Sequence, residues 1–231
     1  VLDVHSNPIN PIIGQRALDT DPTKVARLGA ELIRGFYDAG VIPVGKHFPG
    51  HGDTSQDSHL TLPRVDKTLE SLENTELIPF AHAIQHGLEV IMTAHVVYPS
   101  WDAAQPATFS PSILIEVLRK SLHFEGLIIS DDLEMQAIDQ PLESIPTLGT
   151  EAGVDLFLIC HDLEKVSALQ DAMIQDIETG RIPQTTIEQS LTRIFKVKQR
   201  LQVLQENDSS FKNILADNQS LAQEMRAFLR D

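Results

Sequence analysis

The chain has 231 residues, of which 42% are hydrophobic, and a formal net charge of −15. This size and apolar content are typical of a globular protein with one sizeable core. The acidic balance argues against partners such as nucleic acid or an anionic membrane, which bind through basic patches. The single cysteine, Cys160, excludes an internal disulfide framework, and its apolar surroundings predict that it is buried. No apolar stretch approaches the roughly 18 residues of a transmembrane helix.

Short apolar runs alternate along the chain with segments of helical periodicity. Asp21 and Pro22 supply an N-cap and a first helical residue, and Gly40 ends the helix that they open. We expect strands at residues 1–4, 41–44, 90–92, 127–129 and 155–160. We expect helices at residues 22–39, 68–85, 110–122, 143–152, 163–178 and 186–205, with a further weakly amphipathic helix in the tail at 211–229.

The predicted strands are nearly continuous apolar runs, which is typical of a parallel sheet covered on both faces. The sequence therefore predicts an α/β fold. Polar residues follow directly after each strand, where the active site of a (β/α)8 barrel lies; they are Asp3, His5, Lys46, His47, His95, Asp131, Asp132 and His161. No GxGxxG motif follows the first strand, so a dinucleotide fold has no support and we expect no cofactor.

Residues 46–59, KHFPGHGDTSQDSH, are rich in titratable groups. We expect them to form a long loop after a strand. Asp57 and His59 point to the same side of an extended segment, so Asp57 can accept a hydrogen bond from His59 and leave its other ring nitrogen free for proton transfer. Gly50 and Gly52 suit a loop that moves over a ligand, and they suit any irregular loop equally well.

The same stretch also permits a metal site, because histidine and carboxylate side chains are adequate zinc ligands. The candidate ligands are His47, His51, Asp53, Asp57 and His59. Their spacing matches no helical metal motif, and the glycines and proline exclude a rigid helical platform. We therefore favour the proton-transfer interpretation and predict no metal.

Three other residues are candidates for the same site. Asp131 follows a predicted strand directly, where a carboxylate faces the cleft and can act as nucleophile or base. Its neighbour Asp132 is assigned to local capping or to hydrogen bonds that support the site from behind. Lys46 and His47 come where the preceding strand ends and can bind substrate hydroxyl groups.

Four motifs in order resemble those of the glycoside hydrolase family 3 β-N-acetylhexosaminidases. KHFPGHGDTSQDSH, followed by Leu62-Pro63, is similar to the family signature. The preceding block NPIIGQRAL at residues 10–18 and the following blocks MTAHVVYP at 92–99 and IISDDLEM at 128–135 resemble its neighbours. The resemblance runs from Val1 to about residue 204.

The resemblance implies a (β/α)8 barrel and a retaining hydrolysis of terminal β-linked N-acetylglucosamine through a covalent glycosyl-enzyme. It implies that Asp131 is the nucleophile and that His59, paired with Asp57, is the acid/base. Arg16, Lys46 and His47 are implied to hold the sugar. Bacterial members typically act in the cytoplasm on N-acetylglucosaminyl-1,6-anhydro-muropeptides during peptidoglycan recycling, so the expected partner is a carbohydrate.

A barrel has eight strands, and the sequence offers five. We therefore expect residues 1–206 to supply about strands 4–8 of a catalytic barrel, with a helical tail at 207–231. On this interpretation the chain is amino-terminally truncated, and alone it is inactive or poorly folded.

Two other functions stay open. A histidine acid/base tolerates phosphate as the incoming nucleophile better than a carboxylate does, so the enzyme could be a phosphorylase of the same family. The chain could also be a catalytically silent sugar-binding domain, against which the presence of Asp131, Asp57 and His59 argues.

Overall fold

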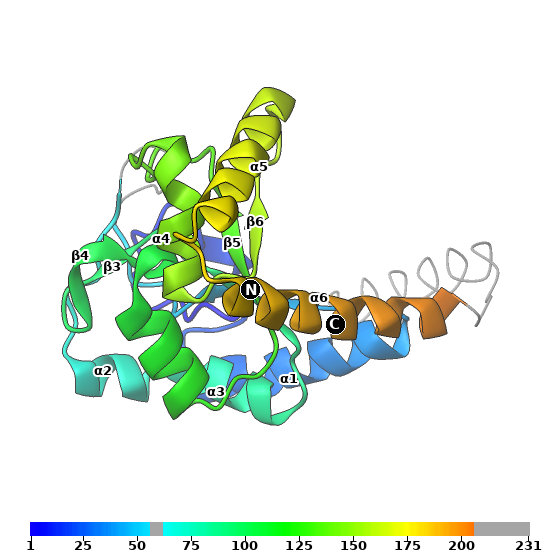
Figure 1. The fold of residues 1–231 in the computed structure, drawn as a ribbon. Helices are drawn as coiled ribbons and strands as arrows, with labels where there is room; N and C mark the ends of the chain where they lie inside the picture. Colours follow the sequence, from blue (N-terminus) through cyan, green and yellow to red (C-terminus); the bar gives the residue numbers. More distant parts are fainter. Residues whose placement is uncertain (56–61, 206–231) are drawn as a thin grey trace.

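The computed structural model describes residues 1–55 and 62–205. Its centre is a parallel sheet in the order β1-β2-β5-β6, formed by Val44–Phe48, Val90–Thr93, Leu127–Asp132 and Leu156–Leu158 (Figure 1). Val90 of β2 pairs with Val44 of β1 on one side and with Leu127 of β5 on the other. The predicted parallel α/β organisation is confirmed.

Helices connect and cover these strands. Helix α1 spans Pro22–Asp38 and begins where predicted, because the Asp21 side chain accepts a hydrogen bond from the Thr23 amide. Helix α1 packs against α3, and α5 packs against α4 (Figure 1). The other helices are α2 (Leu69–Asn74), α3 (Leu77–Gln85), the π-helix η3 (Ser112–Ser121), α4 (Ile145–Ala152), α5 (Leu163–Glu178) and α6 (Gln184–Gln205).

The first strand of the sheet begins three residues later than predicted. It was expected at residues 41–44, whereas β1 spans Val44–Phe48. Pro43 has no amide hydrogen to give to a ladder, so the sheet pairing starts after it. Lys46 and His47 consequently lie inside the strand and not in the loop that follows it.

The single helix predicted at 68–85 is divided into α2 and α3. Pro79 explains the division, because its ring lacks an amide hydrogen and would clash with the carbonyl of Thr75 in a continuous helix. The chain therefore restarts at Leu77, with Pro79 in the first turn of α3. Glu76, at the break, is buried.

Two further expectations differ from the structure. Residues 1–4 form no strand, although the Leu2 amide donates a 2.7 Å hydrogen bond to the Lys46 carbonyl and the segment thus lies beside β1. Strand β6 is shorter than predicted, and Cys160 beyond it is exposed, not buried.

The segment after β2 contains a hairpin that the sequence did not indicate. Strands β3 (Val97–Tyr98) and β4 (Asp102–Pro106) pair antiparallel. The ring of Tyr98 is fully buried, and its hydroxyl donates a 2.7 Å hydrogen bond to the Gly50 carbonyl. The hairpin thereby supports the chain that leaves β1.

Among the described residues, no helix is both long enough and apolar enough to cross a membrane.

Candidate active site

A buried carboxylate orients His47 at the end of β1. Asp3 is fully buried, and its Oδ2 accepts a 2.8 Å hydrogen bond from Nδ1 of His47. Its Oδ1 accepts the backbone amides of His47 at 3.1 Å and of His51 at 2.7 Å. Because Asp3 can only accept when ionised, Nδ1 of His47 carries the proton, and Nε2 is the ring nitrogen that faces the site.

Burial of Asp3 opposes its ionisation, but the charge and hydrogen bonds of His47 and the His51 amide outweigh that cost and lower the pKa of Asp3 to about 2. This is below its ordinary value of 3.8, so ionised Asp3 stabilises the fold at every pH above about 4. That contribution is lost as the pH falls from about 4 to about 2. A shift of this size corresponds to about 2 kcal/mol.

Asp3→Asn is therefore expected to lower the free energy of unfolding at pH 7 by about 2 kcal/mol and to flatten its decline between about pH 4 and pH 2. Urea titrations across this range measure both effects. Asp171→Asn, which replaces an exposed carboxylate on α5, is the matched control and should keep the wild-type slope. An unchanged slope in Asp3→Asn would show that Asp3 is not the linked group.

Asp131 is held at the carboxyl end of β5. Its Oδ1 accepts the Asp132 amide at 2.9 Å, and its Oδ2 lies 3.9 Å from Nε2 of His47. The side chain is 18% exposed, so a ligand can reach it. Oδ1 of Asp132 accepts the Glu134 amide at 3.1 Å, so Asp132 makes a local bond to the backbone, but no helix among the described residues begins there for it to cap.

The loop that follows β1 is packed at its base. A Cβ added at Gly52 would lie 1.6 Å from the Val4 carbonyl oxygen, and one added at Gly50 would lie 2.7 Å from the Glu76 side chain. This close approach gives both glycines a steric role, and the movement of the loop over a ligand stays a prediction. Asn10 holds the same region by donating to the His51 carbonyl at 2.8 Å.

A buried ion-pair network also supports this loop base. Lys67 donates to Glu76 at 2.6 Å and lies 3.4 Å from Asp53. Burial raises the pKa of Glu76 above its usual value, which the hydrogen bond and charge of Lys67 oppose. Asp53 and Lys67 flank residues 56–61 in the sequence, and Lys67 bridges the Asp53 and Glu76 carboxylates.

The remaining predicted site residues have mixed outcomes. Lys46 makes no side-chain hydrogen bond or ion pair within the part of the chain that the structure describes, and it is half-buried next to His47. Arg16 is exposed in the 3-10 turn η1 (Gly14–Arg16), where it donates to the Ile12 carbonyl at 3.3 Å. Asp57 and His59 lie outside the described residues, as does the predicted tail at 207–231.

Two of the five candidate metal ligands, Asp57 and His59, lie outside the described residues. Among the described residues, one group of three side chains brings possible metal-ligand atoms within 4.8 Å of one another, and it consists of Asp132, Glu134 and His161. One oxygen of Glu134 there already accepts the Cys160 and His161 amides at 3.0 and 2.6 Å. The group therefore has a structural explanation, which is to fasten the end of β6 to β5.

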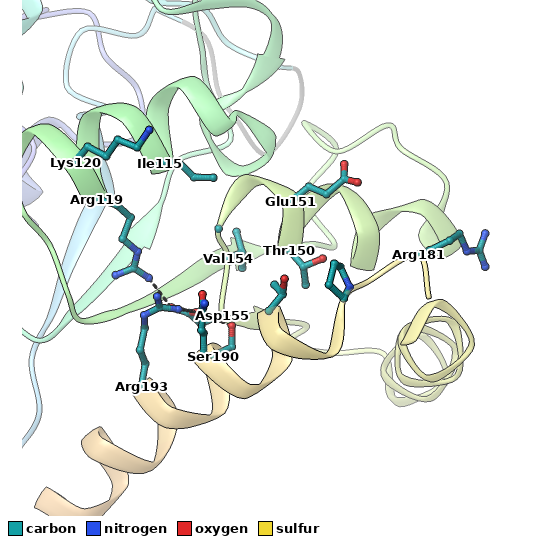
Figure 2. Close-up of a pocket in the computed structure, with 14 residues that line it drawn as sticks. Ile115, Arg119, Lys120, Thr150, Glu151, Val154, Asp155, Arg181, Ser190 and Arg193 are labelled. Atoms are coloured by element: carbon teal, nitrogen blue, oxygen red, sulfur yellow. Dashed lines mark hydrogen bonds and ion pairs between the residues drawn. The ribbon is translucent and has the colours of Figure 1, made fainter. Parts of the chain in front are cut away.

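The sequence placed Asp3 and His95 among the polar residues near strand ends but indicated no role for either, and the structure gives each one. Asp3 orients His47, and His95 donates from its Nε2 to the Asp132 carbonyl at 3.1 Å. Their positions, near the end of the strand predicted at 1–4 and just after the strand predicted at 90–92, were a usable signal. A pocket of about 510 Å³ lies where β6 begins, beside Val154 and Asp155 (Figure 2). Because the strands are parallel, this is the end of the sheet opposite to the carboxyl end of β5.

Comparison with known proteins gives a consistent result. The family described as "Glycosyl hydrolase family 3 N terminal domain" matches residues 1–197. Beta-hexosaminidase of Idiomarina loihiensis is 41% identical over 174 residues, which are 74% of this chain and 52% of that protein. Beta-hexosaminidase A of Pseudoalteromonas piscicida is 36% identical over 220 residues, which are 87% of this chain and 37% of that protein.

Solved structures agree with this result. A glycoside hydrolase family 3 β-N-acetylglucosaminidase from Paenibacillus sp. is 42% identical with a TM-score of 0.86, over 90% of this chain and 40% of that one. CbsA from Thermotoga neapolitana is 36% identical with a TM-score of 0.80, over 87% and 43%. The chain thus spans about half or less of the length of these relatives. The α/β fold expected for a piece of the barrel is confirmed, and the chain belongs to glycosyl hydrolase family 3.

Proposed function

We propose that this chain supplies the catalytic residues of a retaining β-N-acetylhexosaminidase that removes terminal β-linked N-acetylglucosamine. The observation that carries the proposal is the placement of Asp131. Its Oδ1 is held by the Asp132 amide, and its Oδ2 is directed towards His47 at the carboxyl end of the sheet. A carboxylate fixed and accessible in this way can attack the anomeric carbon of a sugar and form a glycosyl-enzyme.

The acid/base in this proposal is His59, paired with Asp57. Protonated His59 gives its proton to the leaving oxygen when Asp131 attacks, and neutral His59 then activates the water that releases the sugar. In retaining glycosidases the two catalytic groups stand roughly 5–5.5 Å apart. We propose that His59 and Asp131 reach this separation when substrate is bound.

Sugar binding is assigned to Arg16, Lys46 and His47. The ammonium group of Lys46 can donate to hydroxyl or acetamide oxygens. Nδ1 of His47 already donates to Asp3, so Nε2 of the neutral ring can accept from a sugar hydroxyl group. From the resemblance to cell-wall enzymes, we propose a cytoplasmic 1,6-anhydro-muropeptide as the natural substrate, with N-acetylglucosamine as its terminal sugar.

The proposal is tested with the full-length protein and 4-nitrophenyl N-acetyl-β-glucosaminide. Proton NMR during early turnover should show the β-anomer of free N-acetylglucosamine as the first product, because two displacements retain configuration. A first product of α-configuration, or no turnover, would contradict the proposal. Repeating the reaction in phosphate distinguishes a hydrolase from the alternative phosphorylase, because a phosphorylase would form N-acetylglucosamine 1-phosphate.

A further inference from the structure

A row of buried polar side chains connects the core to the end of β5. Thr93 in β2, His95 just after it and Thr108 in the short turn η2 (Ala107–Phe109) all have 0% exposure. Oγ1 of Thr93 lies 2.8 Å from Oγ1 of Thr108, which lies 2.8 Å from Nδ1 of His95. Nε2 of His95 lies 3.1 Å from the Asp132 carbonyl oxygen.

The direction of each hydrogen bond in this row follows from its two ends. The carbonyl of Asp132 can only accept, so Nε2 of His95 carries a hydrogen. Burial lowers the pKa of His95, although the charge of Asp131 acts in the opposite sense, so the ring is neutral at pH 7 and Nδ1 is an acceptor. The hydroxyl of Thr108 then donates its one hydrogen to Nδ1 at 2.8 Å and accepts from Thr93, and the Ala94 carbonyl, 3.2 Å from the same oxygen, is the weaker, competing acceptor.

His95 thus holds one side of the peptide unit that joins Asp132 to Leu133. The other side is held by β6, because the Leu133 amide donates a 2.9 Å hydrogen bond to the Leu158 carbonyl. The amide of Asp132, at the other end of the same residue, is the donor that fixes Oδ1 of Asp131. A shift at the Asp132 carbonyl therefore moves the donor that orients Asp131.

We propose that His95 is a positioning residue that sets the orientation of the Asp131 carboxylate through the backbone of Asp132, with Thr108 fixing the His95 tautomer. The inference rests on the proposed glycosidase function of Asp131. His95 does not touch substrate in this account and transfers no proton. Loss of its hydrogen bond should slow the chemical step and leave sugar binding nearly unchanged, because a small displacement of a nucleophile costs rate, not ground-state affinity.

The test compares His95→Leu with His95→Gln in the full-length protein, using 4-nitrophenyl N-acetyl-β-glucosaminide. The leucine variant removes both ring nitrogens, and kcat should fall about 10- to 100-fold with KM within about twofold. Glutamine can place a donor near the position of Nε2, so kcat should recover substantially. Equal kcat values in wild type and His95→Leu, with both proteins folded and active, would overturn the inference.

Thr108 provides a matched pair that leaves His95 in place. Thr108→Val keeps the shape and removes the hydroxyl, so it should lower kcat in the same way, whereas Thr108→Ser keeps the hydroxyl and should retain most of the wild-type kcat. Nitrogen NMR of the imidazole should show a neutral Nε2–H tautomer at pH 7. A protonated ring or an Nδ1–H tautomer would contradict the assignment, whatever the variants do.

These results are distinguishable from failure of the proposed function. A wild-type protein that never releases 4-nitrophenol refutes the glycosidase proposal, while the tautomer measurement still tests the hydrogen-bond row. An active wild type whose His95→Leu variant is equally active refutes only the positioning role. Thermal unfolding of each variant identifies a loss of kcat that comes from misfolding.

Discussion

Asp131→Asn is expected to reduce kcat/KM of the full-length enzyme by roughly 10⁴-fold or more, which is the scale seen when a nucleophile is removed. Asparagine is nearly isosteric, and its Oδ1 can still accept the Asp132 amide that holds the side chain. The variant therefore loses the negative charge and nucleophilicity but keeps the local fold. Initial rates on 4-nitrophenyl N-acetyl-β-glucosaminide measure the effect.

Asp132→Asn is the control beside it. Its Oδ1 can still accept the Glu134 amide, so this local hydrogen bond survives and most activity should remain. Two results would exclude Asp131 as the nucleophile. One is near-normal turnover by a folded Asp131→Asn protein, and the other is an equal loss in both variants.

The largest expected loss of stability comes from Asp155, at the amino end of β6. Oδ1 of Asp155 accepts from Ser190 at 2.7 Å and from Arg193 at 2.9 Å. Oδ2 accepts from Arg119 at 2.8 Å and from the Ile128 amide at 2.9 Å. Figure 2 shows Arg119, Arg193 and Ser190 converging on this carboxylate from η3 and α6.

Asp155→Ala is expected to lower the free energy of unfolding by roughly 3–5 kcal/mol. The Asp155 side chain is 1% exposed and that of Arg119 is 14% exposed, so the change leaves a largely buried cation without its counter-charge. Burial lowers the pKa of Arg119 to about 10, against the attraction of Asp155, so the guanidinium stays charged at pH 7. Urea unfolding at pH 7 measures the change.

Glu116→Ala provides the comparison for Asp155. Glu116 and Lys120 form an ion pair at 2.8 Å on the surface, with side chains 60% and 65% exposed. Such a pair contributes roughly 0–1 kcal/mol. If Asp155→Ala costs no more than Glu116→Ala, Asp155 is not the buried anchor that fastens α6 to the sheet.

The periodicity of the sequence predicts the elements that build the fold. The boundaries of α5 were predicted to the residue, and the parallel arrangement of the strands follows from their continuous apolar character. At two of the places where prediction failed, a proline had changed the local geometry. Pro43 delays β1 and Pro79 divides the helix after residue 68, and neither effect is visible in hydrophobic spacing.

The candidate site was harder to predict because long-range contacts define it. A carboxylate directly after a predicted strand led to Asp131 as the candidate nucleophile, which stays a prediction, and its neighbour Asp132 was expected to bond locally, as it does. The role of Asp3 depends on a contact with His47 across 44 positions of chain, which no local pattern contains. The two glycines after β1 suggested motion from sequence, whereas their packing against Val4 and Glu76 gives them a steric role.

The most direct test of the central claim is to trap the glycosyl-enzyme. A 5-fluoro-N-acetylglucosaminyl fluoride slows release of the sugar more than its attachment, so the full-length protein should gain the mass of one fluorinated sugar. Peptide mapping should locate that sugar on Asp131. A label on another residue, or full turnover of 4-nitrophenyl N-acetyl-β-glucosaminide without any trapped adduct, would contradict the assignment of Asp131 as the nucleophile.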